Sequence, residues 1–136
     1  MHMRRGVLVA ALVVVIGLLV AAAPALGFVT GLTVDSKATL SGNGTTATVS
    51  GTIQCTPEPG NVAFIDAFLI QGKGQQVTFA DGFTMVTCDG SVQPWSAIVS
   101  LPQGGAWKPG KASVTVDASD QDSFLTTQTT VRLTKG

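Results

Sequence analysis

Tyrosine is absent from this 136-residue chain, and its single histidine, His2, lies at the extreme N-terminus. No imidazole remains beyond that residue, which excludes Ser-His and Cys-His catalytic pairs from the rest of the chain. Charged residues make up only 12% of the sequence, and eight Lys and Arg balance eight Asp and Glu. A nucleophile would need a carboxylate, a Lys or a backbone group as its base. The sequence therefore predicts a protein that is not an enzyme and that uses no cofactor.

The N-terminal residues have the three parts of a secretory signal. Two arginines precede an uninterrupted apolar run, which a proline and several small residues follow. This pattern predicts a hydrophobic signal helix in residues 1–27, cleaved after Ala25 or Gly27, and a single secreted domain over residues 28–136. The alternative is an uncleaved membrane anchor, because about 18 to 20 apolar residues can span a bilayer.

Removal of this leader changes the charge balance. From Phe28 onward six basic residues stand against eight acidic ones, so the net charge is 6 minus 8, or −2. The exported part is then expected to have no basic patch, which argues against nucleic acid as a partner. We expect a secreted protein or one at the cell surface or cell envelope, in contact with a membrane only through an uncleaved leader.

Two cysteines, Cys55 and Cys88, lie in the predicted exported part. An even number of cysteines in an oxidising compartment predicts one disulfide. The closed loop has about 34 residues, for which the chain-entropy model gives roughly 3.5 to 4 kcal/mol of stabilisation. The chain has no Cys-x-x-Cys motif and no histidine beyond residue 2, which argues against a redox pair or a metal site.

Residues 28–136 alternate apolar and polar side chains with a period of two, and Gly, Pro, Asn and Asp separate the alternating segments. The pattern predicts an all-β fold, an antiparallel β-sandwich of about seven to nine short strands with one buried face each. The expected strands cover residues 31–35, 38–40, 45–55, 62–71, 75–80, 83–88, 95–101, 111–118 and 124–134. Asp81-Gly82 and Asp89-Gly90 are interpreted as turns.

Three segments carry a resemblance to a known group of domains: "ATLSGNGTTATVSGTIQC", "TCDGSVQPW" and "WKPGKASVTVDAS". They place a Cys at a strand end, then Cys-Asp-Gly and an aromatic residue, then Pro-Gly before a Val-rich strand. In these features the chain resembles the small secreted immunoglobulin-like domains of unknown function common in actinobacterial proteins. The resemblance covers most of residues 38–119 and implies an immunoglobulin-like fold and export, without a catalytic residue. The chain departs from antibody-type domains because Trp95 follows the second cysteine.

The segment 62–70 has apolar side chains on both faces. Such a strand is either covered on both sides or presents an apolar surface to a partner. A central strand covered by a loop or a terminal segment is the first expectation. Asp66 would be costly to bury between Phe64 and Phe68 without a partner, which suggests instead that their face reaches solvent. Phe64, Asp66 and Phe68 are the candidate binding surface, together with Trp107, which follows a Gly-rich loop and is expected to be exposed. Capping an open end of the sandwich would suit Trp107 equally well. Trp95 shares a face with apolar residues and is expected in the core.

Asp117, Asp120 and Asp122 form an acidic cluster and are weak candidates for calcium ligands. A hairpin turn between the last two strands is the preferred interpretation, so no metal site is predicted. The sequence as a whole predicts an exported, non-enzymatic binding or cell-envelope interaction domain whose partner is an unidentified protein or glycan. Two alternatives remain open: a small-ligand carrier, and a hydrolase with a carboxylate-based site.

Overall fold

The computed structural model describes residues 28–102 and 104–136, so the predicted signal helix in residues 1–27 lies outside the described residues. Every regular element in the described part is a β-strand, which confirms the all-β prediction. The strands are β1 (Val29–Val34), β2 (Lys37–Leu40), β3 (Thr46–Cys55), β4 (Val62–Lys73), β5 (Gln76–Thr87), β6 (Val92–Ser100), β7 (Gly110–Ser119) and β8 (Phe124–Lys135). The described residues include no helix that is long and apolar enough to span a membrane.

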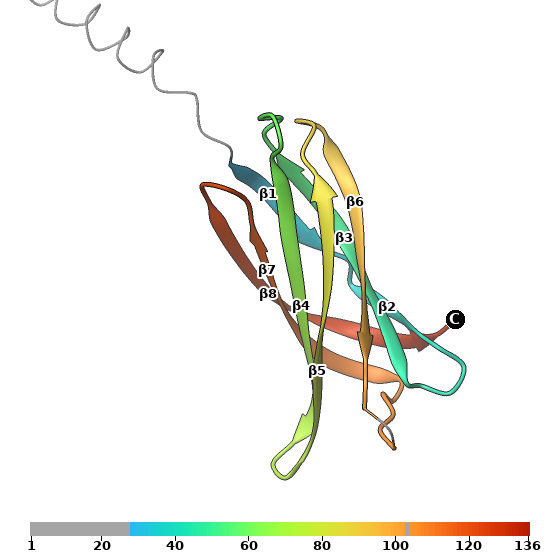
Figure 1. Cartoon of the computed structure of the whole chain (residues 1–136). Coiled ribbons are helices and arrows are strands. Elements are labelled where there is room, and N and C mark those ends of the chain that lie inside the picture. The colour runs from blue at the N-terminus through green and yellow to red at the C-terminus, as the bar shows by residue number, and fades with distance from the viewer. Residues whose placement is uncertain (1–27, 103) are drawn as a thin grey trace, which may run out of the picture.

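All eight strands belong to one hydrogen-bonded sheet, in the order β1-β3-β2-β8-β7-β4-β5, with β6 paired to β3 (Figure 1). β3 pairs with β1, β2 and β6, whereas β7 lies between β8 and β4, and β5 pairs with β4. β2 connects these two halves, because it is antiparallel to β3 and parallel to β8. The expectation of purely antiparallel pairing is wrong at this one pair. Parallel neighbours need a long connection, and nearly the whole domain separates β2 from β8.

The inward side chains of both halves form a single core. Burial along β3 alternates residue by residue, as the period-two pattern predicts. Trp95 is buried, as predicted, and its indole Nε1 donates to the carbonyl oxygens of Thr33 and Thr52, both at 3.2 Å. The largest fully buried apolar side chains are those of Ile53, Ile65, Leu69, Leu133, Val49, Val99, Val114, Val116 and Val131.

The predicted turn at Asp81-Gly82 is wrong. β5 runs without interruption through both residues and pairs with β4 along its whole length. Gly82 is buried, and a Cβ atom at this position would collide with the carbonyl oxygen of Ile98 on β6. Glycine is required here because the backbones of β5 and β6 approach each other closely, and not because the chain reverses. This contact brings the two ends of the sheet together around the core.

Candidate functional site

The outward side chains of β5, β4, β7 and β8 form one continuous surface, which we call the outer face. Residues that pair directly across neighbouring strands point to the same side of a sheet. The strand register therefore arranges the outer face in four rows. In the order β5, β4, β7, β8, these rows are Met85-Phe64-Ser119-Phe124, Phe83-Asp66-Asp117-Thr126, Asp81-Phe68-Thr115-Gln128 and Phe79-Ile70-Ser113-Thr130.

Large apolar side chains are exposed on the outer face. Phe64 and Phe68 are 45% and 37% exposed, and Phe79 and Phe83 on the neighbouring strand are 60% and 59% exposed. The rings of Phe64 and Phe83 are stacked with their centroids 6.0 Å apart, and those of Phe68 and Phe79 are tilted at 6.1 Å. Of the two alternatives for segment 62–70, the structure has the one in which the Phe64 and Phe68 side reaches solvent.

Three residues of β5 belong to this surface although the sequence did not identify them. The prediction from the sequence did not include Phe79, Phe83 and Met85 in this surface, because the predicted turn at Asp81-Gly82 divided their strand. The signal was present in the sequence: every second residue from Val77 to Met85 is apolar except Asp81. A period of two that continues through a Gly is what a continuous strand with a close backbone approach produces.

Three carboxyl groups lie together in the middle of the outer face. Asp66 is the register partner of Asp117, and Asp81 is diagonal to Asp66 on the other side. The pKa of Asp66 is raised to about 6, first by burial, then by a hydrogen bond with the Asp81 carboxyl and by the negative charges of Asp81 and Asp117. Asp117 accepts a hydrogen bond from the Thr126 hydroxyl at 2.8 Å. The four rows hold no Lys or Arg, so this centre is negatively charged at neutral pH.

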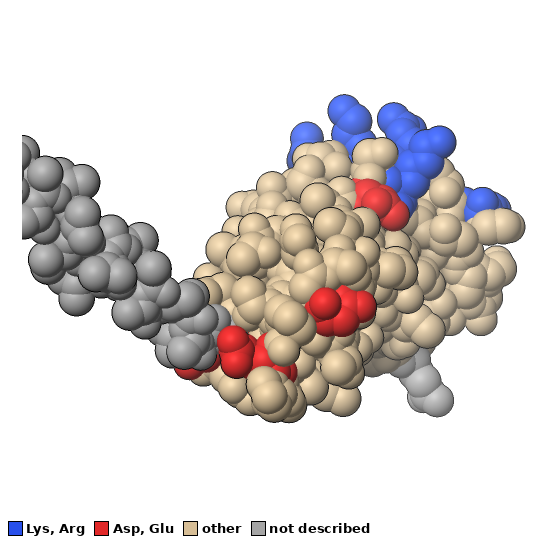
Figure 2. Space-filling model, turned by 90° about the horizontal axis from the view of Figure 1, so that it is seen from above, with Lys and Arg blue, Asp and Glu red and all other residues tan. Residues whose placement is uncertain are grey.

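Five of the six basic residues of the domain gather at one end of the same sheet. Lys111 pairs with Arg132, which pairs with Lys37, and Lys73 and Lys108 line a groove together with Lys111. Figure 2 shows the basic side chains along one side of the surface and most acidic side chains away from them. The expectation of no basic patch is therefore wrong, because residues from separate strands and loops assemble it.

Trp107 is buried, so the prediction that it is exposed is wrong, and the alternative that it caps one end of the core is the one the structure has. Only 2% of the residue is exposed, and its indole Nε1 donates to the carbonyl oxygen of Val99 at 3.2 Å. Its backbone N–H donates to the carbonyl oxygen of Gly44 at 2.7 Å. The loop before β7 folds back so that the ring closes one end of the core, and the buried indole N–H finds a backbone acceptor.

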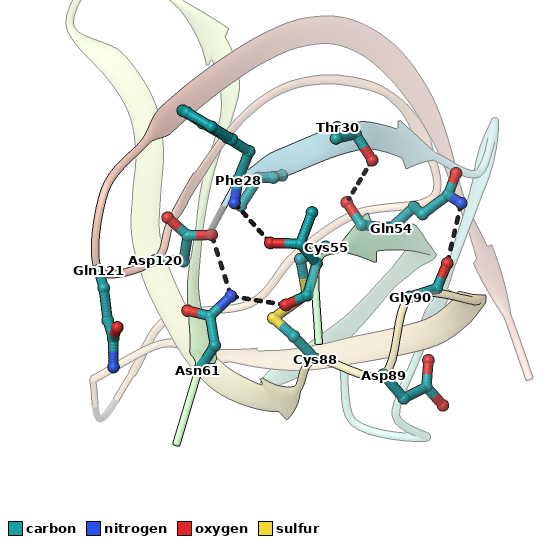
Figure 3. Close-up of a disulfide and its surroundings, with 12 residues drawn as sticks. Phe28, Thr30, Gln54, Cys55, Asn61, Cys88, Asp89, Gly90, Asp120 and Gln121 are labelled. Carbon is teal, nitrogen blue, oxygen red and sulfur yellow. Dashed lines mark hydrogen bonds between the residues drawn. A yellow bond between two sulfur atoms is a disulfide. The ribbon is translucent and has the colours of Figure 1, made fainter. Parts of the chain in front are cut away.

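A disulfide closes the other end of the core (Figure 3). It joins Cys55, the last residue of β3, to Cys88, which follows β5, with an S–S distance of 2.05 Å. The predicted pairing is confirmed. Beside it, Asp89 accepts hydrogen bonds from the backbone N–H and the hydroxyl of Ser91, and Gly90 has a φ of 85°, so the predicted turn at Asp89-Gly90 is present. A disulfide is compatible with an extracellular location.

Asp120 organises the turn between β7 and β8. Its Oδ1 accepts hydrogen bonds from the backbone N–H groups of Asp122 and Ser123 and from the Ser123 hydroxyl, and its Oδ2 accepts one from the Asn61 amide. Burial raises the pKa of Asp120, but these hydrogen bonds outweigh burial and lower the pKa below its ordinary value. Asp117 lies apart on the outer face. No three His, Cys, Asp or Glu side chains within residues 28–102 and 104–136 could hold a metal ion.

Comparison with known proteins identifies the family of this chain. No curated protein shows significant sequence similarity to it. A family model matches residues 29–131, which begin at the first residue of β1 and end within β8. The match includes Cys55, Cys88 and every residue of the four outer-face rows. The chain belongs to DUF6299, a family of unknown function.

Proposed function

We propose that this protein is an exported, non-enzymatic interaction domain that binds a protein or glycan partner at the cell envelope through its outer face. The observation that carries the proposal is the exposure of the two aromatic pairs, Phe64 with Phe83 and Phe68 with Phe79. Contiguous apolar patches on soluble domains mark interaction sites. The leader pattern and the disulfide support export.

The proposed fold is an immunoglobulin-like β-sandwich. In support, β1, β3 and β6 form one half, and β8, β7, β4 and β5 form the other, with one core between them. The short β2 leaves the first half and pairs parallel to the last strand of the second. The outer face is then the solvent side of the second layer.

Two features support a binding role over catalysis. The carboxyl groups of the outer face lie on the sheet itself, and neither the groove beside Lys73 nor the hollow beside Trp107 is lined by any of them. Enzyme sites are usually concave. The small-ligand carrier has less support, because apolar side chains from both halves pack into one cluster.

One observation favours a second candidate function, a carboxylate-based hydrolase. The raised pKa of Asp66 beside Asp81 is the kind of perturbation found at catalytic acids. A panel of chromogenic glycosides and esters tests this function. If the wild-type protein hydrolyses a substrate and Asp66→Asn and Asp81→Asn each abolish this turnover, hydrolysis replaces binding as the function.

The binding function is tested by retention on cell-envelope preparations. The double variant Phe64→Ser and Phe83→Ser removes one aromatic pair from the outer face. The matched control, Val92→Ser and Ile98→Ser, removes two apolar side chains from β6 that are at least as exposed, 62% and 61%. We expect the first variant to lose at least roughly tenfold in retention and the control to bind like the wild type. Equal retention of all three folded proteins would refute the proposed function.

A further inference from the structure

The outer face carries opposite charges near the two ends of a single strand. Asp117 and Lys111 both point outward from β7, because they are six residues apart and side chains alternate with a period of two. At about 3.4 Å per residue, their Cα atoms stand about 20 Å apart. Each charge has a neighbour of the same sign: Asp66 lies beside Asp117, and Arg132 lies beside Lys111.

The acidic row is the one that contains Asp66 and Asp117, and the basic row is the one that contains Lys111 and Arg132. Between them lie mainly apolar and hydroxyl side chains, with Asp81 on the edge strand β5 and Gln128 on β8. The midpoint between the two rows falls between Thr115 and Ser113 on β7. The register partners of these residues are Phe68 and Ile70, so the same line crosses β4 between two apolar side chains. A two-fold axis can lie along this line, parallel to the sheet and perpendicular to the strands. Rotation by 180° about this axis generates a second copy whose basic row faces the acidic row of the first, and whose Phe68 and Ile70 face Ile70 and Phe68 of the first. The acidic and basic rows are complementary under this rotation, whereas Asp81, on the edge strand β5, lies opposite Phe79 of the other copy.

We propose that the partner of the outer face is a second copy of this chain. The two copies associate face to face with their strands antiparallel, so that Asp117 of each copy meets Lys111 of the other. A two-fold interface forms both pairs at once. Sheets that pack face to face lie about 10 Å apart, a gap that Asp and Lys side chains can bridge together. This inference rests on the proposed function, since it uses the same face and names what binds there.

The two charged rows favour a second copy as the occupant of the outer face and favour the antiparallel orientation of that copy. A half-turn about an axis parallel to the strands would set the acidic row against itself and the basic row against itself, which is unfavourable. A nucleic acid would leave the acidic row unmatched, and a neutral glycan would leave both charged rows unmatched. Of the two face-to-face arrangements of two copies, the antiparallel one pairs both rows.

The size of the face indicates a weak dimer. Four strands about 4.8 Å apart, over about 27 Å from Ser119 to Lys111, cover roughly 500 Å² per copy. The total of roughly 1,000 Å² lies at the lower end for specific interfaces. We therefore expect a micromolar dimer that weakens as salt screens the exposed charge pairs.

Sedimentation velocity over about 1 to 300 μM protein tests the dimer. Lys111→Asp and Asp117→Lys each set two like charges against each other in a homodimer, so each should weaken self-association at least roughly tenfold. An equimolar mixture of the two variants pairs every charge again and should form a heterodimer about as tight as the wild-type dimer. Glu58→Lys is the matched charge-reversal control, because Glu58 lies between β3 and β4, outside the outer face and the basic patch, and it should leave the dimer unchanged.

A wild-type protein that stays monomeric at 300 μM would overturn the inference. A dimer that both charge variants leave intact, or whose loss the mixture does not restore, would also overturn it. Phe68→Ser provides a second test at the apolar centre and should weaken the dimer as well. The inference and the proposed function fail separately: a monomeric protein whose envelope retention still depends on Phe64 and Phe83 overturns the dimer alone.

Discussion

The carboxyl group of Asp66 gives a prediction about stability whose sign depends on pH. Its pKa rises from the ordinary value of 3.8 to about 6 in the folded protein. The folded state therefore binds this proton more tightly than the unfolded state does. The stability of the wild-type protein must fall as the pH rises from about 4 to about 6, and the penalty is fully present at pH 7.

The substitution Asp66→Asn removes this charge and should stabilise the protein at pH 7. In a fully buried group, a rise of the pKa from 3.8 to about 6 would correspond to about 3 kcal/mol. Asp66 is only partly buried, so solvent screening reduces the expected gain to about 1 kcal/mol. At pH 4 the gain should shrink to a small fraction, because the folded wild-type protein is then protonated at this position and the unfolded chain nearly half so.

Urea unfolding in dilute solution, where the outer face is free, measures both effects. Wild type, Asp66→Asn and the control Glu58→Gln are compared at pH 7 and pH 4. Glu58 lies in the loop after β3, so Glu58→Gln should change the free energy of unfolding by less than about 0.5 kcal/mol at either pH. A destabilised Asp66→Asn protein at pH 7, or the same gain at both pH values, would refute the account of the acidic centre.

Three further substitutions test the fold that supports the outer face. The double variant Cys55→Ser and Cys88→Ser should lose about 4 kcal/mol of unfolding free energy in chemical denaturation, because 33 residue positions separate the two linked cysteines; an unchanged midpoint would contradict this. Gly82→Ala should lower the free energy of unfolding by about 2 kcal/mol, because the added Cβ meets the backbone of β6. At Gly42 an added Cβ meets nothing within 4 Å, so Gly42→Ala should lower it by less than about 0.5 kcal/mol. Trp107→Ala should lower the free energy of unfolding by about 3 to 4 kcal/mol in the same assay, and a near-neutral effect would contradict the burial of this ring.

The strands could be predicted from the sequence wherever one face is apolar and the other polar. Burial on β3 and β7 follows this alternation, and the disulfide follows from two cysteines in a chain whose leader pattern predicts an oxidising compartment. Local patterns were sufficient in these cases because side-chain direction in a strand depends only on the residue's position along it.

The errors all concern contacts between residues distant in the sequence. Asp81-Gly82 has the composition of a turn, but the approach of β6 decides that glycine is needed within a strand. Trp107 has a loop sequence around it, and only the return of that loop over the core buries its ring. The acidic centre and the basic patch likewise arise from strand register, which composition does not encode.

Hydroxyl-radical footprinting tests most directly the central claim that the outer face is the interaction surface. Met85, the one methionine in residues 28–136, and Phe83 are 58% and 59% exposed on this face. Val92 and Ile98, on β6, are equally exposed controls. The account predicts that binding to the cell envelope, or concentration of the pure protein, protects Met85 and Phe83 from oxidation and leaves the two controls unchanged. Unprotected outer-face residues in the bound protein, or protection confined to β6, would contradict it.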